Sequence, residues 1–313
     1  MKTKTQKTNV PAFAFFGSSR FSVIVLEALE RRGILPAIIV TTPDKPQGRK
    51  MTVTPTPVKV WALARKINVH DAAKLDATFV SELKSDVNGT PNVPFKIPVF
   101  IVASYGKIIP QTVLDIPAKG TLNIHPSLLP QYRGASPLQT AILDDMKNTG
   151  VTIMNIDAEM DHGPIVIQKK VHIDEWPTYE EFETLMANAG AELLAEALPA
   201  WCEDMIEAVQ QDHAKATFTK KIKKEDGLID ISILKSDFEK EQYLAFRKIQ
   251  AYHEWPQAYF FIEHNGKQIR VKITAASWQK AEAAAHGQLV IEKVIPEGGK
   301  EILFEDFKRG YKI

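Results

Sequence analysis

Short runs of consecutive apolar residues recur along the first two-thirds of the chain, with segments of helical spacing between them. Such runs are typical of strands that are buried on both faces of a parallel sheet. We expect strands at 12–17, 35–42, 93–106, 121–125, 150–157 and 163–173. We expect helices at 18–33, 58–67, 136–145 and 178–209, the first capped by Ser18 or Ser19. This alternation predicts an α/β domain with an open, mostly parallel sheet.

The pattern changes after residue 209. Residues 210–217 are polar and are predicted to form a linker. The strands expected in 218–313, among them "EILFED" at 301–306, are shorter and alternate between apolar and polar positions. "HNGKQ" at 264–268 is typical of a hairpin turn. We therefore expect a first domain at 1–209 and a second domain at 218–313 that forms a small β-barrel or sandwich.

Composition narrows the class of protein without changing this division. The chain has 313 residues, a net charge of +1 and a single cysteine, Cys202, so no internal disulfide can form. No apolar run approaches the roughly 20 residues of a spanning helix, and the apolar run after the first nine residues is too short for a signal peptide. We expect a cytoplasmic protein with no membrane partner.

The stretch "TLNIHPSLLPQYRG", residues 121–134, carries the candidate chemistry. Asn123 and His125 are two positions apart, so on a strand they point to the same face. Asp157 and Asp161 follow the strand expected at 150–157. A carboxylate from this turn would hold the His125 imidazole protonated and oriented, with the Asn123 amide as a second donor. Two such donors suit an oxyanion that develops from a carbonyl group.

Taken singly, these residues have ordinary structural explanations as well. His125 could be a capping or surface histidine, Asn123 a turn residue, and the two aspartates turn and helix-start acids. A zinc site formed by His125, Asp161 and His162 lacks the spacing of known ligand sets, and we expect no metal. The glycine turn in "FFGSSRF" could approach a ligand, although it lacks the motifs of phosphate-binding loops.

Two basic segments stand out in a chain that is nearly neutral. The proline-rich loop expected at 43–57 carries Lys45, Arg49 and Lys50. The segment 218–227 carries Lys220, Lys221, Lys223 and Lys224. Both could contact a polyanion such as a nucleic acid, and both could equally be solvated surface segments.

Several long motifs together resemble one family. The run "LNIHPSLLPQYRGASPLQTAILDDMKNTGVTIMNIDAEMDHGPIV" resembles the signature of the methionyl-tRNA formyltransferase family. "FFGSSRFSVIVLEAL" is similar to the opening of that family, and "TTPDKPQGRK" to its characteristic loop. "KKIKKEDGLIDI", "RKIQAYHEWPQAYF" and "FEDFKRG" resemble its C-terminal domain, so the resemblance covers nearly the whole chain.

The resemblance implies a Rossmann-like domain followed by an OB-like β-barrel. It implies formyl transfer from 10-formyltetrahydrofolate to the α-amino group of initiator methionyl-tRNA, for translation initiation, by an enzyme that we expect to be a monomer. By position, the catalytic residues are Asn123, His125 and Asp161. The folate-contacting residues are Ser127, Leu128, Leu129 and Pro130. The tRNA-contacting residues are Lys45, Arg49, Lys50, Lys220, Lys221, Lys223 and Lys224.

Two other functions stay open on the sequence. One is folate-dependent formyl transfer to a small amine, such as a glycinamide ribonucleotide or an amino sugar nucleotide. The other is a non-enzymatic RNA-binding module on a degenerate formyltransferase fold. The sequence also leaves open whether Asp161 acts as a base or only orients His125.

Overall fold

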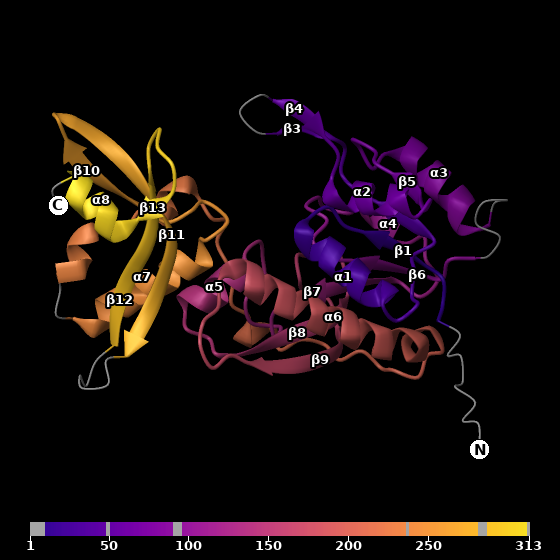
Figure 1. The fold of residues 1–313 in the computed structure, drawn as a ribbon. Helices are drawn as coiled ribbons and strands as arrows, with labels where there is room; N and C mark the ends of the chain where they lie inside the picture. Colours follow the sequence, from indigo (N-terminus) through magenta and orange to yellow (C-terminus); the bar gives the residue numbers. More distant parts are fainter. Residues whose placement is uncertain (1–9, 48–50, 90–95, 236–237, 281–286, 312–313) are drawn as a thin grey trace, which may run out of the picture. The chain divides into compact units, whose positions relative to one another are not determined.

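The computed structural model describes residues 10–47, 51–89, 96–235, 238–280 and 287–311 (Figure 1). The chain forms two compact units. The first comprises residues up to Arg133, Thr149–Val171 and Thr184–Phe218. The second comprises Gly134–Asn148, His172–Glu183 and the residues from Thr219 onward. The domain limits expected from the sequence, with a linker at 210–217, stay a prediction. Two short segments from the middle of the chain, 134–148 and 172–183, belong to the second unit although the chain on both sides of each belongs to the first.

The first unit is built on an open, mostly parallel sheet, as expected. Its strand order is β5-β2-β1-β6-β7-β8-β9. The strands are β1 (Phe13–Phe16), β2 (Ile38–Val40), β5 (Asn68–His70), β6 (Val99–Val102), β7 (Thr121–His125), β8 (Asn148–Asn155) and β9 (Ile165–His172). The pairs from β5 to β7 are parallel, whereas β7 and β8 are antiparallel. From β1 the chain adds β2 and β5 on one side and from β6 it adds β7, β8 and β9 on the other, so the direction of winding reverses between β1 and β6. In open parallel sheets, a ligand crevice lies at such a point, at the carboxyl ends of the strands.

The helices of this region begin and end with recognisable local signals. They are α1 (Arg20–Glu30), α2 (Pro57–Ala64), α3 (Ala77–Val87), α4 (Gln111–Leu114) and α6 (Tyr179–Cys202). Ser19 caps α1 through a capping box with Ser22. β5, α3 and α4 were not expected from the sequence. β5 and α4 have three and four residues, too few to show a period, whereas α3 carries Phe79, Leu83 and Val87 at helical spacing and was overlooked.

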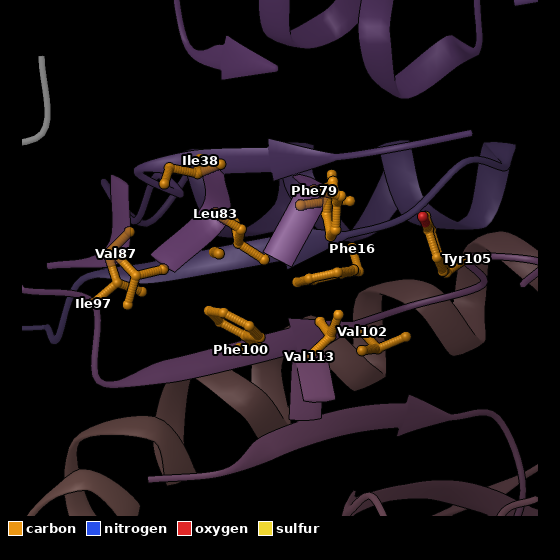
Figure 2. Close-up of a cluster of buried hydrophobic side chains, with 12 residues drawn as sticks. Phe16, Ile38, Phe79, Leu83, Val87, Ile97, Phe100, Val102, Tyr105 and Val113 are labelled. Atoms are coloured by element: carbon orange, nitrogen blue, oxygen red, sulfur yellow. The ribbon is translucent and has the colours of Figure 1, made fainter. Parts of the chain in front are cut away.

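A buried cluster covers one face of the sheet (Figure 2). It joins Phe16 of β1 and Phe100 of β6 to Phe79 and Leu83 of α3. On the opposite face α6 packs against β7, where Gly190 approaches Ile124 so closely that an added Cβ would lie 2.5 Å from its Cγ2 atom. Because side chains alternate along a strand, α6 packs against the face of β7 that carries Ile124. Asn123 and His125 therefore face away from α6.

The second unit contains an antiparallel sheet in the order β10-β11-β12-β13. Its strands are β10 (Tyr259–His264), β11 (Lys267–Lys280), β12 (Gly287–Pro296) and β13 (Ile302–Leu303), and its helices include α5 (Pro137–Leu143), α7 (Glu239–Ala251) and α8 (Phe304–Tyr311). The hairpin turn expected at 264–268 is confirmed, with Asn265 and Gly266 at positive φ. Closure of this sheet into an OB-like barrel stays a prediction.

Two local expectations were wrong. The strand expected over "EILFED" ends after two residues, and α8 begins at Phe304 because Phe304 and Phe307 lie on one helical face and are both buried. The loop expected at 43–57 contains a small hairpin formed by β3 (Lys45–Gln47) and β4 (Thr52–Thr54). In the part of the chain that the structure describes, no helix is long and apolar enough to cross a membrane.

Candidate active site

The structure brings Asn123, His125 and Asp161 together on the face of β7 that α6 does not cover. Asn123 Nδ2 lies 3.4 Å from Asp161 Oδ1. His125 Nδ1 lies 3.5 Å from the same oxygen, and the His125 residue is 4% exposed. Two nitrogen atoms from one strand thus converge on a single point. Both distances are long for a hydrogen bond, so neither nitrogen is tightly held by Asp161.

Asp161 reaches this point by a route that the sequence analysis did not foresee. Because β8 runs antiparallel to β7, with Asn155 opposite Leu122, the chain leaves β8 near the beginning of β7 and not at its carboxyl end. The segment 156–163 then returns along β7. The turn needs Asp161 at φ 52° and leaves no room for a Cβ at Gly163, where it would overlap the carbonyl oxygen of Asn155. Aspartate adopts the left-handed conformation more readily than most non-glycine residues, so Asp161 suits this turn.

Both ring nitrogens of His125 face acceptor atoms. Nε2 lies 3.0 Å from the carbonyl oxygen of Tyr132. A carbonyl can only accept, so Nε2 carries a hydrogen and donates it to Tyr132. Nδ1 faces the carboxyl group of Asp161, and a lone pair on Nδ1 would repel a carboxylate. A hydrogen on Nδ1 would be directed at Asp161, and a ring that carries this hydrogen donates from both nitrogens.

The predicted folate segment is hydrogen-bonded to the hydroxyl group of Thr152 on β8. Thr152 Oγ1 donates to the Ser127 carbonyl at 2.7 Å and accepts from the Leu129 N–H at 3.1 Å. Gln168 donates to Thr152 Oγ1 and to the Leu129 carbonyl. Ser127 and Leu129 are 1% and 3% exposed. Only Leu128 and Pro130 of the four predicted residues keep partly exposed side chains.

The backbone amides of the glycine turn after β1 are hydrogen-bonded within the protein. Gly17 N donates to the Val40 carbonyl and Ser18 N to the Ser104 carbonyl, so these amides are already paired. This argues against a phosphate-binding loop, which needs unpaired amides. Tyr105 is buried nearby, and burial raises its pKa to about 12, so its phenol stays neutral at physiological pH.

The predicted tRNA-contacting residues are only partly described. Lys45 is exposed at the start of β3, and Arg49 and Lys50 lie outside the described residues. The second basic segment presents four exposed lysines, Lys220, Lys221, Lys223 and Lys224. Their contact with nucleic acid stays a prediction.

His162 does not take part in a metal cluster in the described part of the chain. Its Nδ1 pairs with Asp157 Oδ2 at 2.7 Å, and its ring stacks on His213 with centroids 4.0 Å apart. Among the described residues, no group of three histidine, cysteine, aspartate or glutamate side chains is arranged to hold a metal ion.

Comparison with known proteins identifies the family to which this chain belongs. Residues 11–198 match the family described as formyl transferase. The fold also resembles that of an N-formyltransferase from Helicobacter canadensis, with a TM-score of 0.59, 17% identity and coverage of 94% of this chain and 98% of that chain. The chain therefore belongs to the formyl transferase family.

Curated relatives define the branch more narrowly. The methionyl-tRNA formyltransferase of Chloroflexus aurantiacus is 40% identical over 91% of this chain and 84% of its own length. That of Koribacter versatilis is 35% identical over 95% of both chains. At this identity and coverage, the branch to which the chain belongs is that of the methionyl-tRNA formyltransferases.

Proposed function

We propose that this protein transfers a formyl group from 10-formyltetrahydrofolate to the α-amino group of initiator methionyl-tRNA. The observation that carries the proposal is the convergence of Asn123 Nδ2 and His125 Nδ1 on one oxygen of Asp161. Similarity to methionyl-tRNA formyltransferases along nearly the whole chain supports the choice of acceptor.

Asp161 Oδ1 shows the direction in which both nitrogens point, and the reacting oxygen would bind beside it, within reach of the same two donors. Because the contacts with Asp161 are long, at 3.4 and 3.5 Å, both nitrogens can turn toward a formyl oxygen as negative charge develops on it. The hydrogen bond from His125 Nε2 to Tyr132 keeps the ring oriented during this change. Each donor of this kind typically contributes about 2.7–4 kcal/mol to transition-state stabilisation.

The bond changes follow from this arrangement. The neutral α-amine attacks the formyl carbon, and the carbonyl electron pair moves to the oxygen held by Asn123 and His125. The tetrahedral intermediate collapses when the bond between the formyl carbon and N10 of the folate breaks. The amine loses one proton and N10 gains one, so the products are formylated methionyl-tRNA and tetrahydrofolate. Asp161, whose Oδ1 lies 3.5 Å from His125 Nδ1, would orient the ring or accept the proton that the amine loses.

The folate segment completes the proposed site. Leu128 and Pro130 would contact the folate, while the buried Ser127 and Leu129 hold the loop in place. A rigid apolar wall beside the formyl group would also limit the access of water, which competes with the amine as a nucleophile.

The experiment that tests the proposal compares acceptors. Purified protein is incubated with 10-formyltetrahydrofolate and charged initiator methionyl-tRNA, charged elongator methionyl-tRNA or small amines. Formylation confined to the initiator tRNA is the expected result. Transfer to a sugar amine or to glycinamide ribonucleotide alone would overturn the acceptor while keeping the reaction. RNA binding without transfer would support the degenerate-fold alternative.

A further inference from the structure

Gln211 holds the turn that carries Asp161. Its side-chain amide nitrogen donates to the Asp161 carbonyl at 2.9 Å and to the Gly163 carbonyl at 2.7 Å. Gln211 is only 5% exposed although it lies in the segment that the sequence analysis treated as a linker. These two hydrogen bonds fix the backbone on either side of His162, the residue between Asp161 and Gly163.

Arg133 determines which way the Gln211 amide points. Its Nε and one terminal nitrogen donate to Gln211 Oε1 at 3.1 and 2.6 Å, and the same terminal nitrogen lies 2.8 Å from His213 Nδ1. An arginine can only donate, so Gln211 must turn its oxygen toward Arg133 and its NH2 group toward the turn. Arg133 is 4% exposed, which strengthens these bonds by excluding water.

The same pair of residues also reaches the other side of His125. Arg133 follows Tyr132, whose carbonyl accepts from His125 Nε2. The Arg133 N–H donates to the Thr217 carbonyl and the Tyr132 N–H donates to Thr217 Oγ1, so residues 132–133 are fixed to the segment that contains Gln211. The buried Arg133–Gln211 pair therefore connects Tyr132, which accepts from His125 Nε2, with the turn that carries Asp161, which faces His125 Nδ1.

We propose that Gln211 is a positioning residue for formyl transfer, which holds the Asp161 carboxyl group at the convergence point of Asn123 and His125. This rests on the proposed function of Asp161. Asp161 stands at a left-handed φ of 52°, and two hydrogen bonds from one amide keep that conformation in place. Without them the turn relaxes, and the carboxyl group moves away from His125 and Asn123 while both substrate surfaces stay intact.

The test is the variant Gln211→Glu, with Gln210→Glu as its matched control. A glutamate still accepts from Arg133, but its carboxylate repels the Asp161 and Gly163 carbonyls that the amide held. Gln210 is the exposed neighbour, so the same change there alters the charge without touching the turn. We expect Gln211→Glu to lower kcat for formylation by roughly 10- to 100-fold, with little change in KM for folate or tRNA, and Gln210→Glu to match the wild type.

Combination with Asp161→Asn separates positioning from a general structural role. If Gln211 acts through Asp161, the double variant is no slower than Asp161→Asn alone, because residues that act as a unit are not additive. Multiplied losses in the double variant, or a normal kcat in Gln211→Glu, would overturn the inference. A near-normal Asp161→Asn variant would instead remove Asp161 from the proposed function.

Folding is monitored by thermal unfolding of each variant. If Gln211→Glu does not fold, Gln211→Asn replaces it, since the shorter amide keeps its polarity but cannot span Arg133 and both carbonyls. The same criteria then apply to its kcat, its KM values and its combination with Asp161→Asn.

Discussion

His125 is fixed by two acceptors of different kinds. The Tyr132 carbonyl holds Nε2 at 3.0 Å, whereas Asp161 lies 3.5 Å from Nδ1. The stronger contact orients the ring, and the weaker one leaves Nδ1 able to turn its hydrogen toward another oxygen. A catalytic donor needs this combination, because a nitrogen already bound tightly by the protein has little to offer the transition state.

Replacing His125 by alanine should lower kcat for formylation by at least about 100-fold, because one of the two donors to the developing oxyanion is lost. Steady-state kinetics with both substrates checks this. His172, an exposed histidine on β9 that pairs with Asn148, provides the control, and His172→Ala should stay close to the wild type. Near-normal turnover by His125→Ala would refute its assigned role.

At the level of elements, the folate segment depends on β8 for its shape. Thr152 is completely buried, and its hydroxyl takes part in three hydrogen bonds, to Ser127, Leu129 and Gln168. The loop after β7 is thus a rigid attachment to the neighbouring antiparallel strand and not an independent turn. Its geometry follows from the pairing of β7 with β8.

Thr152→Val keeps the volume of the side chain but leaves the Leu129 N–H and the Ser127 carbonyl without this partner. Such buried groups cost about 1–3 kcal/mol each when unsatisfied, so the free energy of unfolding should fall by at least that amount. Denaturant unfolding measures the loss, and KM for the folate donor should rise. Thr112→Val on the exposed surface of α4 is the control. An unchanged stability would mean that the loop holds its shape without Thr152.

For the whole molecule, a net charge of +1 makes no general attraction to a polyanion, so binding of tRNA would have to come from local groups of basic residues. Lys45 lies in the first unit and Lys220, Lys221, Lys223 and Lys224 lie in the second, and all five are exposed. Each lysine that neutralises a phosphate contributes to the salt dependence of binding.

If these five lysines contact phosphates, they should together contribute about −3.5 to −4.5 to the slope of the logarithm of tRNA affinity against the logarithm of salt concentration. Equilibrium binding from low to moderate salt measures the slope. Replacing the four lysines of the second unit by glutamine should reduce its magnitude by about 3, with folate binding unchanged. The same slope in this variant would exclude those lysines as phosphate contacts.

Many secondary-structure elements of this protein can be predicted from short stretches of its sequence. Uninterrupted apolar runs identified the central strands, and the turn residues Asn265 and Gly266 marked a hairpin. Ser18 and Ser19 were the two candidate caps of α1, and the structure uses Ser19. The spacing of Asn123 and His125 placed them on one face of β7, because the two-residue period of a strand is a property of the backbone. These features depend on neighbours only a few positions apart.

Only the tertiary structure decided how the rest of the site is assembled. The antiparallel pairing of β8 made the chain return before Asp161 could meet His125, and no local pattern specifies that direction. Gln211 lies 50 residues from Asp161 and 78 from Arg133, so its hydrogen bonds exist only after the chain has folded. Local periodicity determines strands and their faces, whereas long-range pairing of backbone and buried polar groups determines which distant side chains meet.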